Sequence, residues 1–82
     1  MSRDEYESLF YKMLGEILVG MRQKQGRTFE DVACILDIPP MTFYKWENGT
    51  RKIPLQILYK LCKFYKVSID EVIEEANRKI KK

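Results

Sequence analysis

Residues 28–49 constrain the fold more than any other stretch, because they predict two short helices joined by a tight turn. Thr28 is a good amino-terminal cap, and Asp31 follows at the spacing of a capping box. We therefore expect a first helix over residues 29–36. Its apolar side is predicted to consist of Val32, Ala33, Ile35 and Leu36.

The second helix of this pair is predicted over residues 40–47. Asp37 lies where the chain must reverse, and aspartate tolerates a left-handed backbone at modest cost. Pro40 lacks an amide hydrogen and has a fixed φ, which suits a first helical turn, and Asn48-Gly49 is a typical helix end. The stretch is therefore predicted to be a helix-turn-helix. The inward side chains of the second helix are Phe43 and Trp46.

The opposite face of the second helix has no core to fill. At helical spacing this face carries Pro40, Met41, Tyr44, Lys45 and Asn48. We therefore expect these side chains to contact a partner.

A longer pattern connects this pair of helices to a known family. The pattern is a small residue, a turn, three inward apolar residues, Glu-Asn-Gly and a basic loop: Ala33, Asp37, Ile38, Phe43, Trp46, Glu47-Asn48-Gly49 and Thr50-Arg51-Lys52. It resembles the lambda-repressor-like DNA-binding domain of the Cro/cI or XRE type, and the likeness covers about residues 14–73. The resemblance implies an all-α, five-helix domain with an extended first helix. It also implies a sequence-specific regulator of transcription, such as a repressor, whose second helix enters the major groove of double-stranded DNA.

The resemblance also implies roles for individual residues. The base-contacting residues would be Pro40, Met41, Tyr44 and Lys45. The phosphate-contacting residues would be Thr28, Phe29, Thr42, Asn48, Thr50, Arg51 and Lys52. In the family an arginine in the first helix pairs with the glutamate of Glu-Asn-Gly, which here predicts a structural ion pair of Arg22 with Glu47.

Two departures from the family pattern keep a second function open. Phe29 stands where relatives have a glutamine that reaches a phosphate. Pro40 and Met41 stand where relatives present polar side chains, although they can touch a thymine methyl group and Lys45 can reach guanine. The alternative is a protein-protein interaction module on the same fold, with weak or no specific DNA binding.

The rest of the chain predicts three more helices around one core. Ser2 with Glu5 forms a capping-box pattern, and the apolar period runs without a break to the vicinity of Gly26. We expect helices over residues 3–25, 54–65 and 69–80, the last opened by a capping box of Ser68 with Glu71. The apolar stripe of the helix over 54–65 is predicted to be Leu55, Leu58, Leu61, Cys62 and Tyr65.

Residues 1–82 are therefore read as a single domain, with a helical extension over 2–13 and a basic helix end over 74–82. The extension carries Tyr6, Phe10 and Tyr11, which either pack back on the domain or take part in a dimer. We expect a homodimer, because one recognition helix makes few contacts with DNA. Its face is predicted around Ile69, Ile73, Ala76 and Ile80, with Tyr6 and Phe10 as additional candidates.

Composition narrows the function classes. The net charge is +3, and residues 22–66 hold nine Lys or Arg against four Asp or Glu, so the basic part lies where DNA would be bound.

The chain has no histidine, glycine-rich phosphate loop or paired-carboxylate pattern, so we expect no enzyme, no cofactor, no metal and no small-molecule ligand. Cys34 and Cys62 lie in helical apolar patterns and predict packed, reduced thiols. No long apolar run predicts a membrane span, and we expect a cytoplasmic protein.

Overall fold

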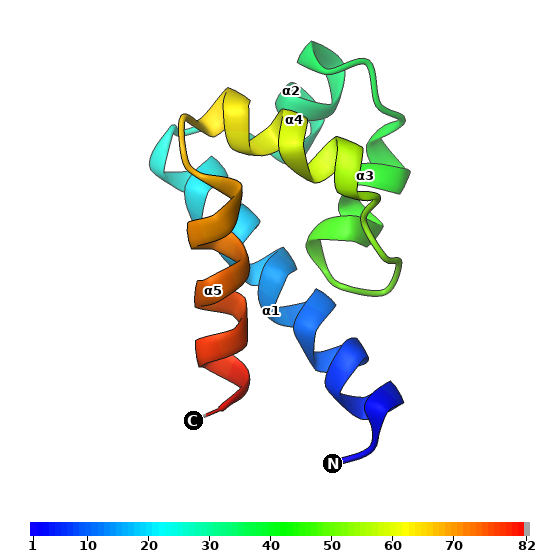
Figure 1. Ribbon diagram of the computed structural model, residues 1–82. Coiled ribbons are helices and arrows are strands. Elements are labelled where there is room, and N and C mark those ends of the chain that lie inside the picture. The colour runs from blue at the N-terminus through cyan, green and yellow to red at the C-terminus, as the bar shows by residue number, and fades with distance from the viewer. Residues whose placement is uncertain (82) are drawn as a thin grey trace.

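The computed structural model describes residues 1–81, and this part of the chain folds into five helices without a strand (Figure 1). The helices are α1 (Arg3–Lys24), α2 (Phe29–Ile35), α3 (Pro40–Glu47), α4 (Leu55–Tyr65) and α5 (Ile69–Ile80). The predicted all-α architecture with a long first helix is confirmed. Lys82, the last residue of the predicted basic end, lies outside the described residues.

Side-chain caps begin two of the helices as the sequence predicts. The Thr28 hydroxyl accepts a hydrogen bond from the Asp31 amide at 3.1 Å, and the Thr28 amide donates to the Asp31 carboxylate at 3.2 Å, which completes a capping box. At α1, the Ser2 hydroxyl accepts from the amide of Glu5 at 3.2 Å. The capping box predicted at Ser68 is wrong, because its side chain makes no cap hydrogen bond. Ser68 is exposed, so water can satisfy its hydroxyl and the first amides of α5.

Left-handed residues set the reversals between helices. Asp37 has φ 57° between α2 and α3, as predicted, and Gly49 has φ 76° after α3. Gly49 also needs its lack of a side chain, because a Cβ there would lie 2.7 Å from Cα of Lys12. The loop that follows α3 is thereby held against α1.

One apolar core is formed by buried side chains from all five helices. Its fully buried members include Leu14, Leu18, Val32, Ala33, Phe43 and Leu61. Ile35 and Leu55, which were predicted to face inward, are 52% and 69% exposed. Val32, Ala33 and the half-buried Leu36 already fill the short face of α2, and Leu55 is the first residue of α4, a turn before the buried Leu58. Cys34 is exposed as well, so of the two predicted packed thiols only Cys62 is buried.

The amino-terminal extension packs on its own chain. α1 and α5 run side by side, and both chain ends lie on the same side of the molecule (Figure 1). The Tyr6 hydroxyl donates to Oδ1 of Asn77 on α5 at 2.5 Å. Phe10 and Tyr11 are half-buried against the core. Intramolecular packing therefore accounts for the aromatic residues of the extension.

Candidate nucleic-acid interface

The two faces of α3 have opposite environments. Phe43 is fully buried and Trp46 is 9% exposed, so these side chains fix the helix on the core. On the other side Met41 is 61% exposed and Tyr44 is 44% exposed, and Pro40 and Lys45 are exposed beside them. The four predicted base-contacting residues therefore share one accessible face of α3.

The turn between α2 and α3 is fixed by backbone hydrogen bonds. The Ile38 amide donates to the carbonyl of Ala33 at 2.8 Å, which closes the chain around Asp37. Phe43 donates to the carbonyl of Pro39 at 3.1 Å, so α3 begins directly after the turn. Ala33 is fully buried in the contact between the two helices. A larger side chain there would change the position of α3 relative to α2.

Arg22 and Glu47 form the ion pair that the family resemblance implies. Nε of Arg22 donates to Oε2 of Glu47 at 2.8 Å, and Nη2 donates to Oε1 at 3.1 Å. Nη1 donates to the carbonyl of Arg27 at 2.7 Å, so the guanidinium is bonded on three sides. The hydrogen bond that Arg22 donates to Glu47 raises the pKa of Arg22 and outweighs the opposing effect of burial. The pair ties the last turn of α3 to α1.

Gly15 allows a close approach of α1 to the end of α3. A Cβ at this position would lie 2.2 Å from the carbonyl oxygen of Glu47, where no side chain can be accommodated without movement. Gly20, a turn and a half further along α1, has open space instead. The sequence pattern did not single out Gly15. Its only signal was a glycine inside a helix, where glycine is unfavourable without a packing reason.

Phe29 packs against Tyr44 on the exposed face of α3. Its ring centroid lies 5.3 Å from that of Tyr44, with the ring planes tilted by 45°. Phe29 is half-buried, so this contact restricts the rotamers open to Tyr44. The aromatic residue that replaces the family's glutamine therefore supports a side chain on the accessible face of α3.

The predicted phosphate-contacting residues lie at the start of α2, on α3 and in the segment that follows α3. Thr28, Asn48, Thr50, Arg51 and Lys52 are exposed, and Phe29 and Thr42 are half-buried. Within the loop, Oδ1 of Asn48 accepts from the Thr50 amide at 3.0 Å and from the Thr50 hydroxyl at 2.7 Å. These bonds leave the donor side of the Asn48 amide free to face solvent. Arg51 forms no ion pair within residues 1–81.

Lys52 is in contact with the extension of α1. Its ammonium forms an ion pair with the Glu7 carboxylate and lies 5.9 Å from the centre of the Tyr11 ring. The Lys52 side chain is 66% exposed, so the pair lies at the surface. This contact could not be predicted from the sequence, because Glu7 and Lys52 are far apart along the chain and no periodicity relates them.

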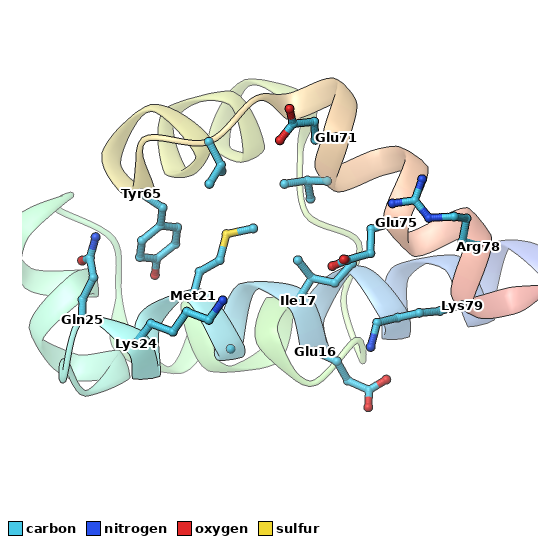
Figure 2. Close-up of a pocket in the computed structure, with 13 residues that line it drawn as sticks. Glu16, Ile17, Met21, Lys24, Gln25, Tyr65, Glu71, Glu75, Arg78 and Lys79 are labelled. Atoms are coloured by element: carbon cyan, nitrogen blue, oxygen red, sulfur yellow. The ribbon is translucent and has the colours of Figure 1, made fainter.

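A groove lies away from α3. It has a volume of about 650 Å³ and lies between α1 and α5, with acidic side chains such as Glu71 and Glu75 and basic ones such as Lys24 and Lys79 (Figure 2). The Tyr65 hydroxyl points toward α1 at one end of it and has no hydrogen-bond partner among residues 1–81. Burial raises the pKa of Tyr65 to about 12. None of the predicted DNA-contacting residues lines this groove.

The part of the chain that the structure describes contains neither a metal-binding cluster nor a membrane-spanning helix. No group of three or more His, Cys, Asp or Glu side chains within residues 1–81 could hold a metal ion. In the same range no helix has the length and hydropathy needed to cross a membrane. Burial raises the pKa of the Cys62 thiol, which keeps it in the less reactive protonated form.

Comparisons with known proteins identify the fold and the family. The crystal structure of the clp gene regulator ClgR from C. glutamicum is similar, with a TM-score of 0.75 and 23% sequence identity over 85% of this chain and 91% of that chain. No curated protein sequence matches significantly. The helix-turn-helix family model HTH_3 matches residues 21–72, which span the end of α1, all of α2, α3 and α4, and the first turn of α5. The chain therefore belongs to the HTH_3 helix-turn-helix family, the Cro/cI type of DNA-binding domain.

Proposed function

We propose that this protein is a sequence-specific regulator of transcription that places α3 in the major groove of double-stranded DNA. The observation that carries the proposal is the division of α3 into a fixed face and a free face. Phe43 and Trp46 are buried in the core and Glu47 is buried and bonded to Arg22, whereas Met41 and Tyr44 are open to solvent. A helix held rigidly on one side and bare on the other suits insertion into a groove about 12 Å wide.

The chemistry of the free face limits what it can read. Lys45 can donate to O6 or N7 of guanine, which is the strongest base contact available to this set. Pro40 and Met41 have no side-chain donor, and they would contact the methyl group of thymine. Tyr44, held by Phe29, would add its ring edge or hydroxyl. We therefore expect the protein to prefer a short base sequence that contains guanine and thymine.

Contacts to the DNA backbone would set the position of α3. Arg51, Thr50 and Asn48 follow α3 directly, and the exposed loop that they form would follow one phosphate strand. Thr28, Phe29 and Thr42 would lie near the other side of the groove. Such contacts orient a protein on DNA and carry no direct sequence information.

We further propose that the protein acts as a homodimer. A single α3 of eight residues presents four outward side chains, which is few for a specific complex at physiological salt. Two copies related by a two-fold axis would present two such helices to half-sites about 34 Å apart, one turn of DNA.

Selection of bound sequences from a random duplex pool tests this proposal. We expect enrichment of two-fold symmetric sites with guanine and thymine in each half-site. The oligomeric state should be measured on the same preparation by light scattering. A pool that shows no enrichment after repeated rounds would contradict sequence-specific binding.

The exposed Met41 and Tyr44 side chains are the observation that favours the alternative, a protein-binding module. Under that alternative, Met41→Ala or Tyr44→Ala would abolish a protein complex whose affinity changes little with added salt, because apolar burial is screened far less than phosphate contact. DNA binding would then be weak and without sequence preference.

A further inference from the structure

We propose that the groove between α1 and α5 binds a small carboxylic acid with an apolar body. We call it the α1–α5 groove. The inference goes beyond the proposed function, because none of the predicted DNA-contacting residues lines this groove. Its volume of about 650 Å³ lies within the range of small-molecule sites in proteins, roughly 300 to 1,000 Å³.

One part of the α1–α5 groove is apolar. Ile17 and Val72 are buried members of the core, and the half-buried Met21 and Val67 line the groove with them. Gly20 adds open space, because a Cβ there would meet no atom of residues 1–81 within 4 Å. Glycine is unfavourable inside a helix, and no close packing contact explains this one. The apolar body of a ligand lying over Gly20 would explain it.

One end of the groove presents hydrogen-bond donors. Tyr65 is only 7% exposed, and its hydroxyl points toward α1 at this end without a partner among residues 1–81 (Figure 2). Lys24 lines the same end and forms no ion pair within that range. Gln25 lines it as well. Because Oε1 of Gln25 already accepts from Nε of Arg27 at 3.1 Å, the free group of this side chain is its amide donor.

These donors suit a carboxylate. A buried hydroxyl without a partner destabilises the fold, so a ligand oxygen that accepts from Tyr65 removes an existing cost. Burial raises the pKa of Tyr65 to about 12, so the hydroxyl keeps its proton at neutral pH and can donate. An ionised carboxylate only accepts hydrogen bonds, and Lys24 supplies the opposite charge. The acidic residues of the groove, Glu16, Glu71 and Glu75, lie away from this end (Figure 2).

Met21 controls access to the Tyr65 hydroxyl. The hydroxyl is buried, so a carboxylate reaches it only when a neighbouring side chain moves. Met21 lies between Tyr65 and Ile17 in the groove (Figure 2). Methionine is unbranched and flexible, and it adapts its shape at little cost. We therefore expect the ligand to displace the Met21 side chain.

The groove depends on tertiary packing, whereas the sequence predicts no small-molecule ligand. It exists because α5 lies along α1 and because α4 ends with Tyr65 directed at α1. Ala76, which was predicted to belong to a dimer face, is fully buried within its own chain, on the helix that packs against α1. No periodic pattern in the sequence relates the residues that meet here.

The first test titrates octanoate and 3-phenylpropanoate into the full chain and follows the backbone amide resonances by NMR. We expect saturable shifts at Gly20, Met21 and Val67 with at least one of these acids, and a dissociation constant below about 1 mM. Octanol and octylammonium carry the chain of octanoate without its carboxylate, and each should bind at least about tenfold more weakly than octanoate. No saturable shift with either acid up to about 10 mM, or equal affinity for the three octyl compounds, would overturn the proposal.

Tyr65→Phe tests the contact with the carboxylate. The variant keeps the ring and removes only the hydroxyl, so we expect the affinity for octanoate to fall about tenfold, because a hydrogen bond to a charged group is lost. The matched control is Tyr59→Phe, which removes a hydroxyl from a 49% exposed tyrosine outside the groove and should leave the affinity unchanged. Thermal melting checks that both variants are folded. A folded Tyr65→Phe protein that binds octanoate as the wild type does would overturn the assignment of the carboxylate to this end.

Gly20→Leu tests whether the ligand lies in the groove. The added side chain would occupy the open space beside α1, so we expect octanoate binding to be lost while the fold is kept. Gln23→Leu is the matched control, because it adds a leucine at an exposed position of α1 that does not line the groove. None of these measurements uses DNA, so their outcome is independent of the proposed function. A folded Gly20→Leu protein that still binds octanoate like the wild type would show that the acid binds elsewhere.

Discussion

Arg22 on α1 and Glu47 at the end of α3 are joined by two hydrogen bonds of 2.8 and 3.1 Å, and their side chains are only 12% and 4% exposed. Both side chains of the pair are shielded from solvent, whereas the predicted base-contacting residues of α3 are exposed. The pair therefore holds the helix in place without using any group that could read DNA. Its role is to hold α3 on the rest of the domain.

Removal of either partner should cost far more than the loss of a surface ion pair. Arg22→Ala or Glu47→Ala leaves the other charge desolvated, and we expect a loss of about 3 kcal/mol in the free energy of unfolding. Arg78→Ala is the control, because Arg78 and Glu74 form an exposed pair at 3.9 Å, and its loss should cost only ~0.5 kcal/mol. Urea denaturation of the two single variants and the double variant gives the coupling energy. Small, additive losses would show that the pair does not stabilise the fold.

Two glycines of α1 should respond in opposite directions to the same substitution. Gly15→Ala places a Cβ 2.2 Å from the carbonyl oxygen of Glu47, so the helices must separate, and we expect a loss of about 2 kcal/mol or more. Gly20→Ala meets no atom within 4 Å and should stabilise the protein by up to ~1 kcal/mol, because alanine loses less entropy in a helix. Thermal unfolding of both variants measures the difference. A Gly15→Ala protein as stable as the wild type would contradict the close approach of α1 to α3.

The buried hydroxyl of Tyr65 should make stability fall at high pH. Burial raises the pKa of this group to about 12, so the folded state keeps a proton that the unfolded state loses near pH 10. Stability is therefore unaffected below about pH 10 and declines as the pH rises toward 12. Tyr65→Phe should remove this part of the decline and cost little at neutral pH, because the hydroxyl has no hydrogen-bond partner. Urea unfolding from pH 8 to 11.5 checks both effects. An equally steep decline in the variant would assign it to other groups.

Glu7 should weaken DNA binding by holding Lys52. The Glu7 carboxylate is paired with the Lys52 ammonium in the folded domain, so Glu7→Gln frees a cation in the loop after α3. We expect tighter binding to all duplexes and an increase of up to about one unit in the dependence of affinity on salt. Glu16→Gln makes the same change of charge at an exposed position of α1 and serves as the control. Equal effects of the two substitutions would show that net charge, and not release of Lys52, determines the affinity.

Features that depend on neighbours along the chain could be predicted from the sequence. The cap at Thr28, the left-handed Asp37 and the outward residues of α3 follow from local propensity and helical period. These features fix the helix boundaries to within about two residues, which is the usual uncertainty of helix ends.

Features that depend on how helices cross could not be predicted in this way. Helical period alone did not show that Ile35 would be exposed, because its burial depends on whether a neighbouring helix covers it. The closeness of Gly15 to Glu47 and of Glu7 to Lys52 also requires the positions of α1 and α3. Phe29 illustrates both cases, because its departure from the family pattern was visible in the sequence, but its contact with Tyr44 was not.

We propose that α3 reads bases while the loop after it contacts phosphates, and substitutions of Lys45 and Arg51 distinguish the two roles. Lys45→Ala and Arg51→Ala each remove one positive charge at an exposed position, so each serves as the matched control for the other. The measurement is the affinity of the wild type, Lys45→Ala and Arg51→Ala for the selected site and for a scrambled duplex, each at two salt concentrations.

Lys45→Ala should lose about 1 to 3 kcal/mol on the selected site and flatten discrimination at one base position. Arg51→Ala should weaken binding to both duplexes alike and reduce the salt slope by about one unit, because one fewer counterion is released. If both variants bind the selected and the scrambled duplex as the wild type does, at both salt concentrations, α3 is not a recognition helix.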